Sequence, residues 1–224
     1  MGTSNWQNIS YNLTLVKKIN PQKILDVGIG FGRWGILFRE ILEIWDEDNY
    51  SGKWKRQIDG VEIFEGYLKE YHKLFYTNIF RMDIREFIKI NEEKYDLINC
   101  GDIIEHFEKK EGENLIKSFL ERTTYLLINL PLGKYWEQDI KNNNPNEQHL
   151  SVWNINDFAK YPFKRIKIFR DLHMRKYAVI LLSNSEFTFQ DDFKLIYGKY
   201  FHIKKYLKHI FHLRKLINYY EKKK

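Results

Sequence analysis

The sequence predicts an α/β fold in which helices flank a mostly parallel sheet of seven strands. Two patterns predict it. Short apolar segments alternate with amphipathic segments at helical spacing. The first apolar segment, which includes Ile24, Leu25 and Val27, leads directly into a run of closely spaced glycines. The chain of 224 residues is also long enough to bury a sizeable core.

The predicted elements follow this alternation along the chain. Strands are predicted near residues 23–28, 58–63, 77–82, 95–101, 124–130, 163–170 and 174–183. Helices are predicted over 5–20, from Ile36 to Trp45, between most of the later strands, and over 153–160. The polar, asparagine-rich segment from Lys134 to Gln148 predicts a loop or lid.

The first strand, the glycine run and the helix after it form a nucleotide-binding corner. Glycine lets the backbone turn tightly and approach a ligand closely. The start of the helix supplies unpaired N–H groups. The order is Asp-x-Gly-x-Gly-x-Gly from Asp26 to Gly32, which differs from the dinucleotide pattern G-x-G-x-x-G.

This pattern resembles motif I of the class I S-adenosylmethionine (SAM)-dependent methyltransferases. The resemblance covers about residues 20–185. It implies a Rossmann-like sheet with an antiparallel last strand, SAM as the cofactor, and cofactor contacts from Asp26, Gly28, Gly30 and Gly32. A cluster of turn glycines in another kind of α/β protein is the alternative interpretation.

Further motifs of that family follow in the expected order. The second strand ends in Glu62 and Ile63. The resemblance makes Glu62 the carboxylate that accepts hydrogen bonds from both ribose hydroxyls, which suits its two acceptor oxygens. A surface acid at the end of a strand is the alternative. Gly101 ends the fourth strand and belongs to the same implied site.

Asp83 and Ile84 resemble the motif whose acid lies near the adenine amino group. Asp83 and Glu86 also fit a helix capping box, and the two roles are compatible.

A cluster of acids and histidines follows the fourth strand. Asp102, Glu105 and His106 lie within about one helical turn, and His149 follows about forty residues later. Acid-x-x-Glu-His followed by His-x-x-x-Trp resembles the metal site of the small-RNA 3′-end 2′-O-methyltransferases, and ubiquinone-type O-methyltransferases share the first half. The resemblance makes these four residues metal ligands, although the RNA enzymes have Glu where this chain has Asp102.

Three interpretations of this cluster remain open. Two carboxylates and two imidazoles suit Mg²⁺, Mn²⁺ or Fe²⁺, which would lower the pKa of an acceptor hydroxyl. Without a metal, His106 or His149 is a candidate general base, because imidazole titrates near neutral pH. In the structural alternative, His106 caps a carbonyl and His149 anchors the lid.

The positive charge is concentrated at the C-terminal end. Residues 193–224 carry ten Lys or Arg and one Glu, a net charge of +9, whereas the whole chain carries +7. Residues 1–192 are therefore predicted to form the methyltransferase domain, and residues 193–224 a basic amphipathic helical tail. Such a tail packs on a protein, lies on an anionic membrane surface or binds nucleic acid.

The composition narrows the cellular setting. The single cysteine, Cys100, argues against a disulfide scaffold and suits a reducing compartment. No apolar run reaches 18 residues, and the first residues do not resemble a signal peptide. We expect a cytoplasmic protein, with peripheral membrane contact through the tail.

The sequence thus predicts a SAM-dependent methyltransferase. A small molecule, glycan or lipid-linked sugar is the favoured acceptor of an O-methylation. The alternatives are a metal-dependent RNA 2′-O-methyltransferase and a catalytically silent SAM-fold protein that binds a partner. The insert from Glu43 to Gln57, rich in Trp, Tyr and charge, is expected to contribute to a substrate wall. The oligomeric state is not specified by these patterns.

Overall fold

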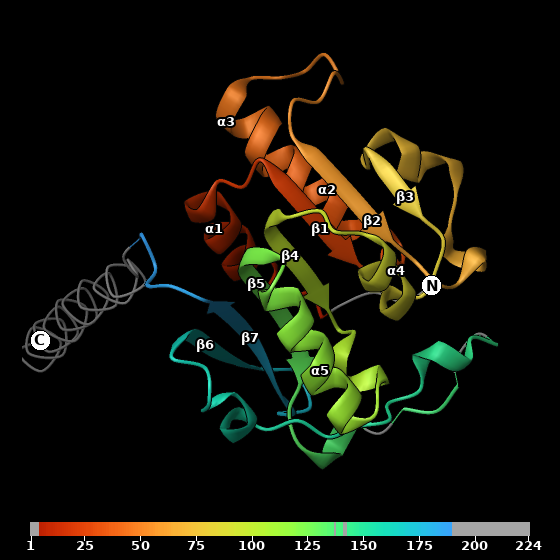
Figure 1. Ribbon diagram of the computed structural model, residues 1–224, viewed down its shortest axis with the longest axis vertical. Helices are drawn as coiled ribbons and strands as arrows, with labels where there is room; N and C mark the ends of the chain where they lie inside the picture. Colours follow the sequence, from red (N-terminus) through yellow and green to blue (C-terminus); the bar gives the residue numbers. More distant parts are fainter. Residues whose placement is uncertain (1–4, 137, 141–142, 190–224) are drawn as a thin grey trace, which may run out of the picture. The chain divides into compact units, whose positions relative to one another are not determined.

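A single seven-stranded sheet forms the centre of the computed structural model (Figure 1), in the order β3-β2-β1-β4-β5-β7-β6. The structure describes residues 5–136, 138–140 and 143–189. The strands are β1 (Lys23–Val27), β2 (Gln57–Val61), β3 (Asn78–Phe80), β4 (Tyr95–Gly101), β5 (Thr123–Pro131), β6 (Phe163–Arg170) and β7 (Lys176–Ser183). Strands β1 to β5 pair in parallel, and β7 runs antiparallel to both β5 and β6. The predicted fold class and the antiparallel last strand are confirmed.

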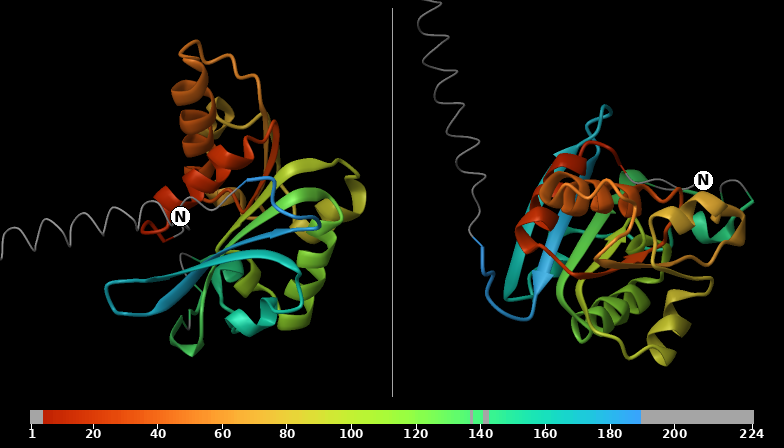
Figure 2. Two further views of the ribbon diagram at one scale, coloured as in Figure 1. Left: turned by 90° about the vertical axis from the view of Figure 1, so that its left-hand side faces the viewer. Right: turned by 90° about the horizontal axis from the view of Figure 1, so that it is seen from above.

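Helices cover both faces of the sheet (Figure 2). Those on one face are α1 (Ile9–Ile19), α2 (Arg33–Arg39) and α3 (Trp45–Glu47). Those on the other face are α4 (Ile84–Ile90) and α5 (Lys109–Leu120). A π-helical turn, η1 (Glu40–Ile44), joins α2 to α3, so the predicted helix from Ile36 to Trp45 contains one widened turn. The helices enclose strands such as β5 and β7, whose apolar side chains are almost entirely buried.

Short 3₁₀ turns complete the connections. They are η2 (Glu65–Tyr67), η3 (Glu70–Leu74), η4 (Ile104–His106), η5 (Lys134–Trp136), η6 (Pro145–Glu147) and η7 (Ile155–Phe158). The helix predicted over 153–160 is wrong in length and type, because only η7 is helical there. Asn154 and Asp157 cap each other's backbone N–H groups, which closes a single tight turn. Phe158 then packs into the core.

The insert from Glu43 to Gln57 is held by a buried ion pair. The carboxylate of Glu43, which is fully buried, accepts hydrogen bonds from Arg39 Nη1 and from the backbone N–H of Lys55. Arg56 donates to the carbonyls of Leu42 and Pro21. The insert is therefore fastened to α2 and to the start of β1, at the end of β1 opposite the glycine run.

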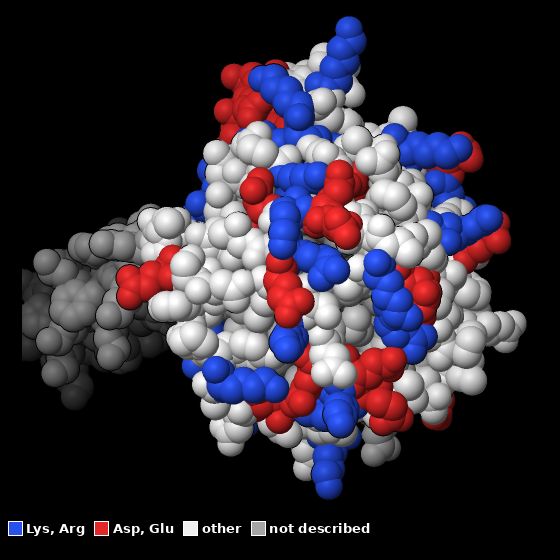
Figure 3. Space-filling view, viewed as in Figure 1, with Lys and Arg blue, Asp and Glu red and all other residues white. Residues whose placement is uncertain are grey.

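The residues as far as Phe187 form one compact unit. Acidic and basic side chains are interspersed on the face seen in Figure 3, in agreement with the near-neutral charge of this part of the chain. None of the helices within the described ranges combines the length and apolar character needed to cross a membrane. The predicted basic tail, residues 193–224, lies outside the described residues.

Candidate functional site

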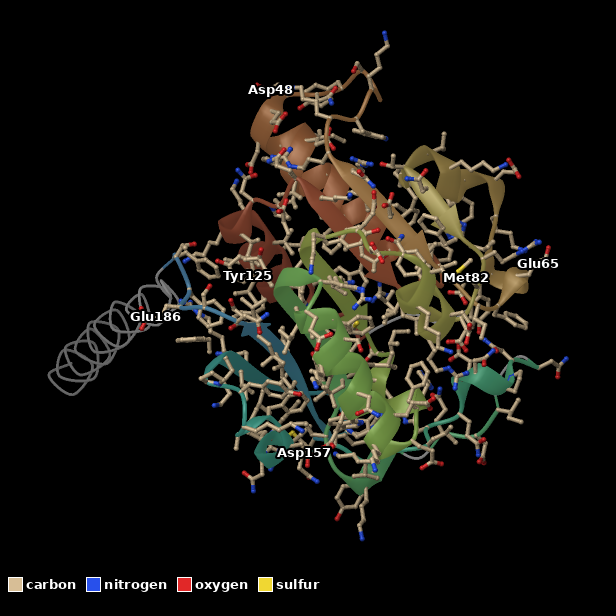
Figure 4. The ribbon with its side chains drawn as sticks, in the orientation of Figure 1. Asp48, Glu65, Met82, Tyr125, Asp157 and Glu186 are labelled. Carbon is tan, nitrogen blue, oxygen red and sulfur yellow. The ribbon has the colours of Figure 1, made fainter. Side chains whose placement is uncertain are left out.

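A cavity of about 460 Å³ lies at the carboxyl ends of the parallel strands. Its walls include Gly28 after β1, Glu62 after β2, Met82 after β3 and Gly101 at the end of β4. Figure 4 labels Met82 at this edge of the sheet. The volume falls within the range of roughly 300–1,000 Å³ that is typical of small-molecule sites.

The glycine run shapes one wall of this cavity. Gly28 has a φ of +74°, and a Cβ there would lie 2.1 Å from Ile103 Cδ1, so only glycine fits without a shift. Gly28 and Gly30 line the cavity, but Gly32 does not. A Cβ on Gly32, the N-cap of α2, would lie 2.7 Å from the His72 ring. The structure therefore gives Gly32 a packing role behind the predicted cofactor contacts.

Asp26 also lies behind the cavity wall. Its carboxylate is almost fully buried and accepts hydrogen bonds from Tyr76 Oη (2.6 Å) and Asn99 Nδ2 (2.8 Å). The Gly35 N–H donates to the same Tyr76 hydroxyl (3.2 Å), which connects Asp26 to the first turn of α2. Burial raises the pKa of Asp26 to about 7. Asp26 thus supports the glycine corner and does not line the cavity.

Glu62 faces the cavity and is fixed by main-chain donors. The Gly30 N–H donates to Oε2 (2.9 Å), and the Phe64 N–H donates to Oε1 (2.8 Å). Each oxygen keeps acceptor capacity for a further donor, such as a hydroxyl of a diol. Burial raises the pKa of Glu62 above its usual value. Ile63, half exposed, lines the cavity beside it.

Asp83 and Ile84 line the opposite end of the same wall. Asp83 is the N-cap of α4, and its carboxylate accepts from the Arg85 N–H (2.7 Å) and from the Arg85 guanidinium. Burial acts to raise the pKa of Asp83, but the hydrogen bonds from Arg85 outweigh it and the pKa is lowered. The helix-cap role predicted for Asp83 is confirmed, and it coexists with a place in the cavity wall.

Glu105, His106 and His149 form a cluster on the far side of the cavity. One ligand atom from each lies within 4.8 Å of the others, and the two imidazole centroids are 5.0 Å apart. Glu105 is almost fully buried, and its Oε2 has no hydrogen-bond partner among the described residues. Burial, followed by the charge of Asp102, raises the pKa of Glu105 well above its usual value.

Backbone carbonyls orient both imidazoles. His106 Nδ1 lies 3.0 Å from the Gln148 carbonyl, and His149 Nδ1 contacts the Trp136 carbonyl. A carbonyl only accepts, so in each neutral ring Nδ1 carries the hydrogen and Nε2 carries the lone pair. That tautomer suits either a metal ligand or a general base. The predicted structural roles, a carbonyl contact by His106 and anchoring of the lid by His149, are thus compatible with a chemical role.

Asp102 lies apart from this cluster. Its backbone has a φ of +55°, and its N–H donates to the Asn129 carbonyl (2.9 Å) before the chain enters η4. Asp102 lines the cavity and interacts electrostatically with Arg33 and Tyr177. The four predicted ligands therefore share one cavity, but the structure brings only three of them together.

The segment from Lys134 to Gln148 walls the cavity over the cluster. The N–H groups of Leu150 (2.9 Å) and Ser151 (3.1 Å) donate to the Glu105 carbonyl, which binds the end of this segment to η4. Tyr67 Oη donates to Glu147 Oε1 (2.7 Å), which connects the segment to the Glu62 side. The predicted loop or lid is thus a cavity wall with its own contacts to both sides.

Several cavity residues are not predicted by the sequence patterns. They are polar or aromatic side chains from separate elements: Arg33, Tyr67, Trp136, Gln138, Glu147 and Tyr177. Arg33 directly follows Gly32, and Glu147 lies two residues before His149, so these two have a nearby sequence signal. None of the lining residues comes from the insert 43–57, so the expected substrate wall from that insert is not found among the described residues.

The cluster fits a divalent metal ion. A buried carboxylate oxygen without a hydrogen-bond partner and two imidazoles with Nε2 lone pairs are the donor set of 2-His-1-carboxylate sites. This set favours Mn²⁺ or Fe²⁺ over Mg²⁺, which prefers oxygen ligands. The predicted set with Asp102 as a second carboxylate would have suited Mg²⁺ better.

Comparisons with known proteins agree on the fold. No protein-family model matches the chain, and no protein of curated function matches it. Among solved structures, the chain is similar to magnesium protoporphyrin IX methyltransferase from Synechocystis PCC 6803 with bound SAH (TM-score 0.56, 13% identity, 82% of this chain and 90% of that chain).

Two further solved structures are similar. One is a putative O-methyltransferase from Klebsiella pneumoniae (TM-score 0.55, 11% identity, 82% of each chain). The other is the O-methyltransferase from Bacillus cereus in complex with SAH (TM-score 0.51, 13% identity, 81% of this chain and 83% of that chain). At these identities the likeness shows a shared fold, the Rossmann-like fold of SAM-dependent methyltransferases.

Proposed function

We propose that this protein is a SAM-dependent methyltransferase that methylates a hydroxyl oxygen of a small, neutral or cationic acceptor, such as a sugar. One observation carries the proposal. The glycine corner and Glu62 share a single cavity with the Glu105–His106–His149 cluster. A methyl donor and an acceptor hydroxyl therefore have room side by side. Two of the similar structures hold SAH.

Different residues of the cavity serve the methyl donor and the acceptor hydroxyl. Glu62 accepts hydrogen bonds from the ribose diol, and Gly28 and Gly30 let the donor approach the backbone closely. SAM, when bound, supplies an electrophilic methyl group. His106 or His149 takes the acceptor proton at Nε2, because a backbone carbonyl holds the hydrogen of each ring at Nδ1.

The charge of the cavity bears on the acceptor. The described lining residues include six carboxylic acids and two arginines: Glu62, Asp83, Asp102, Glu105, Glu111, Glu147, Arg33 and Arg85. Even with Glu105 protonated, the acids outnumber the arginines. Such a field attracts the positive sulfonium and repels phosphates. This favours a sugar or another uncharged hydroxyl compound over RNA, and Trp136 and Tyr177 offer aromatic contact area.

A metal at the cluster is the second form of the proposal and takes the place of the histidine base, because an Nε2 that binds an ion has no lone pair left to accept a proton. Glu105, His106 and His149 would hold it, and a bound ion would lower the pKa of a coordinated hydroxyl. Methyl transfer should then fall in EDTA and return with Mn²⁺ or Fe²⁺ more readily than with Mg²⁺. Full activity in EDTA would contradict the metal while leaving the general-base role intact.

The test of the function is acceptor capture. Purified full-length protein and methyl-labelled SAM are added to a cell extract, which is then separated into small molecules, lipid-linked sugars, glycans and RNA. We expect label as a methyl ether in an uncharged hydroxyl fraction, and none with Glu62→Ala. Label confined to RNA 2′ oxygens would support the alternative predicted from the His motifs. SAM binding by calorimetry with no label in any fraction would support the catalytically silent alternative.

A further inference from the structure

The hairpin that joins β6 to β7 ends in a tip with exposed apolar side chains. Leu172 is 84% exposed and Met174 is 64% exposed. Figure 2 shows this hairpin extending beyond the helices that cover the sheet. Two large apolar side chains at the end of one projecting turn bury little area within the chain, and a contact outside it would bury them.

The tip holds a defined shape. Asp171 Oδ1 accepts from the N–H groups of His173 (2.9 Å) and Arg175 (2.8 Å), and its Oδ2 pairs with the Arg175 guanidinium (2.8 Å). Met174 has a φ of +62°, in the left-handed region that Gly or Asn occupies more readily. An apolar side chain is thus presented at a position where a smaller or polar residue would strain the backbone less.

Basic residues flank these apolar side chains. Residues 167–176 carry Lys167, Arg170, Arg175 and Lys176 against the single acid Asp171, a net charge of +3 with His173 neutral. Lys134 and Tyr135, both exposed, belong to η5, whose Trp136 indole donates to the Lys176 carbonyl (2.8 Å) and lies under Arg175 (3.9 Å to the ring centroid). Apolar side chains surrounded by basic residues are complementary to an anionic lipid surface, because its negative headgroups cover an apolar interior.

Strand β7 next to this turn, at Tyr177, also belongs to the wall of the cavity. Trp136 and Tyr177 both line the cavity, and their rings meet edge to face with centroids 6.4 Å apart. A surface that contacts the tip therefore comes close to the part of the cavity wall that Trp136 and Tyr177 form.

We propose that residues 170–176, with Lys134 and Tyr135, form a docking surface for an anionic phospholipid membrane, into which Leu172 and Met174 insert. This inference stands apart from the proposed reaction, because it rests on the exposed hairpin alone. It is also separate from the predicted membrane contact of residues 193–224.

The test uses an environment-sensitive fluorophore on single cysteines in the full-length protein. The native Cys100 is buried and shielded from labelling. Labels are placed at Leu172→Cys and Met174→Cys, and at the matched exposed positions Leu74→Cys (62%) and Ile90→Cys (69%). With vesicles of phosphatidylcholine and phosphatidylserine, we expect blue-shifted, brighter emission at 172 and 174 and unchanged emission at 74 and 90.

A second measurement separates the tip from any other membrane contact. The double variant L172Q/M174N should bind these vesicles about tenfold or more weakly, because the apolar insertion is lost. Asn suits the left-handed backbone at 174, so the turn is kept. The control variant L74Q/I90Q should bind as the unchanged protein does, and SAM affinity should be unaltered in both.

Several outcomes would overturn the docking surface. If the protein binds vesicles while the labels at 172 and 174 emit as they do in water, the membrane contact lies elsewhere in the chain. Binding that is equally strong in L172Q/M174N would lead to the same conclusion. Absence of vesicle binding, with self-association or RNA binding that the double variant abolishes, would assign the tip to a second copy or to nucleic acid.

Discussion

The two sides of the cavity differ in the kind of chain that builds them. After the proposed function, we call the glycine corner with Glu62 the donor side and the Glu105–His106–His149 cluster the acceptor side. The donor side is built by strand ends, and the bond from Gly30 N–H to Glu62 joins consecutive loops of adjacent strands. The acceptor side joins residues more than 40 positions apart, such as His106 and Gln148. Loops at the ends of paired parallel strands therefore position the donor side, whereas the acceptor side depends on how the irregular chain around Lys134–Ser151 folds back onto η4.

If the donor and acceptor sides act independently, the largest loss of activity should come from a substitution on the acceptor side, with SAM binding unchanged. We expect His149→Ala to lower methyl transfer by about 10²–10⁴-fold, the usual contribution of a general base. SAM affinity, measured by calorimetry, should change less than twofold. A nearby exposed residue that does not line the cavity provides a control, Val152→Ala, which should retain activity. A parallel loss of SAM affinity in His149→Ala would mean that the two sides are not separable.

The donor side should show a distinct pH dependence of stability. The pKa of Asp26 is raised from 3.8 to about 7. Between these values the folded protein binds more protons than the unfolded chain, so the free energy of unfolding should fall as the pH rises from 4 to 7. About three units at 1.36 kcal/mol each give roughly 4 kcal/mol over that range.

Denaturant unfolding across this pH range measures the effect. Asp26→Asn should remove the decline. Tyr76→Phe, which deletes a hydrogen bond that lowers the pKa of Asp26, should extend the decline to higher pH. The same slope in Asp26→Asn as in the unchanged protein would show that another group is responsible.

Gly28 and Gly133 have similar φ angles but differ in the space around them, so together they separate the cost of crowding from the cost of the backbone angle. At Gly28 (φ +74°) an added Cβ would meet Ile103, whereas at Gly133 (φ +81°), on the acceptor side, an added Cβ would meet nothing within 4 Å. We expect Gly133→Ala to cost about 1–2 kcal/mol of stability from the backbone angle alone. Gly28→Ala should cost about 1–3 kcal/mol more, because Ile103 must move.

Thermal and denaturant unfolding give both numbers. The added cost at Gly28 should shrink in the background of Ile103→Ala, and that background should not change the cost at Gly133. Equal costs at the two glycines would mean that the contact with Ile103 is relieved without penalty.

Glu62→Ala tests the donor contact itself. Removal of the buried carboxylate that we propose as the acceptor of the ribose hydroxyls should weaken SAM binding by about 1.5–3 kcal/mol, the scale of charged hydrogen bonds. Calorimetry on the folded variant measures it, and Mn²⁺ binding at the other side should be retained. Unchanged SAM affinity would remove Glu62 from the donor site.

The smallest effect should come from the bond that connects the two sides. Tyr67→Phe deletes the hydroxyl that donates to Glu147 (2.7 Å), worth about 1 kcal/mol. Amide hydrogens of residues 144–151 should exchange about fivefold faster, while those of β4 should not change. Unchanged exchange in this segment would mean that the bonds to the Glu105 carbonyl suffice to hold it.

The sheet and the donor corner are predictable from the sequence because both depend on local patterns. A continuous apolar segment marks most of the seven strands, and the spacing of Asp83 and Glu86 correctly predicts a helix cap at Asp83. The sequence patterns overestimate the lengths of α1 and η7. Helix α1 begins at Ile9, four residues later than predicted, and a reciprocal cap closes η7 after one turn.

The acceptor side is predictable only in part. Spacing suggests that Asp102 joins Glu105 and His106, but spacing does not reveal that Asp102 adopts a φ of +55° and bonds to β5 before η4 begins. Tyr177 reaches the cavity because β7 pairs with β5, and Trp136 reaches it through its hydrogen bond to the Lys176 carbonyl; no local pattern encodes either contact. The role expected for the insert 43–57 fails for a similar reason, since its buried ion pair holds it away from the cavity.

Backbone bonds fasten the segment between Gly133 and Leu150 at both ends. The Gly133 N–H donates to the Trp153 carbonyl (2.9 Å), and the Leu150 N–H donates to the Glu105 carbonyl (2.9 Å). Such main-chain anchors do not depend on which side chains the segment carries. Residues of the segment other than His149 can therefore diverge, or be replaced by those of another chain, while the scaffold that holds the segment stays intact. Acceptor preference can then evolve, or be engineered, without rebuilding the donor corner.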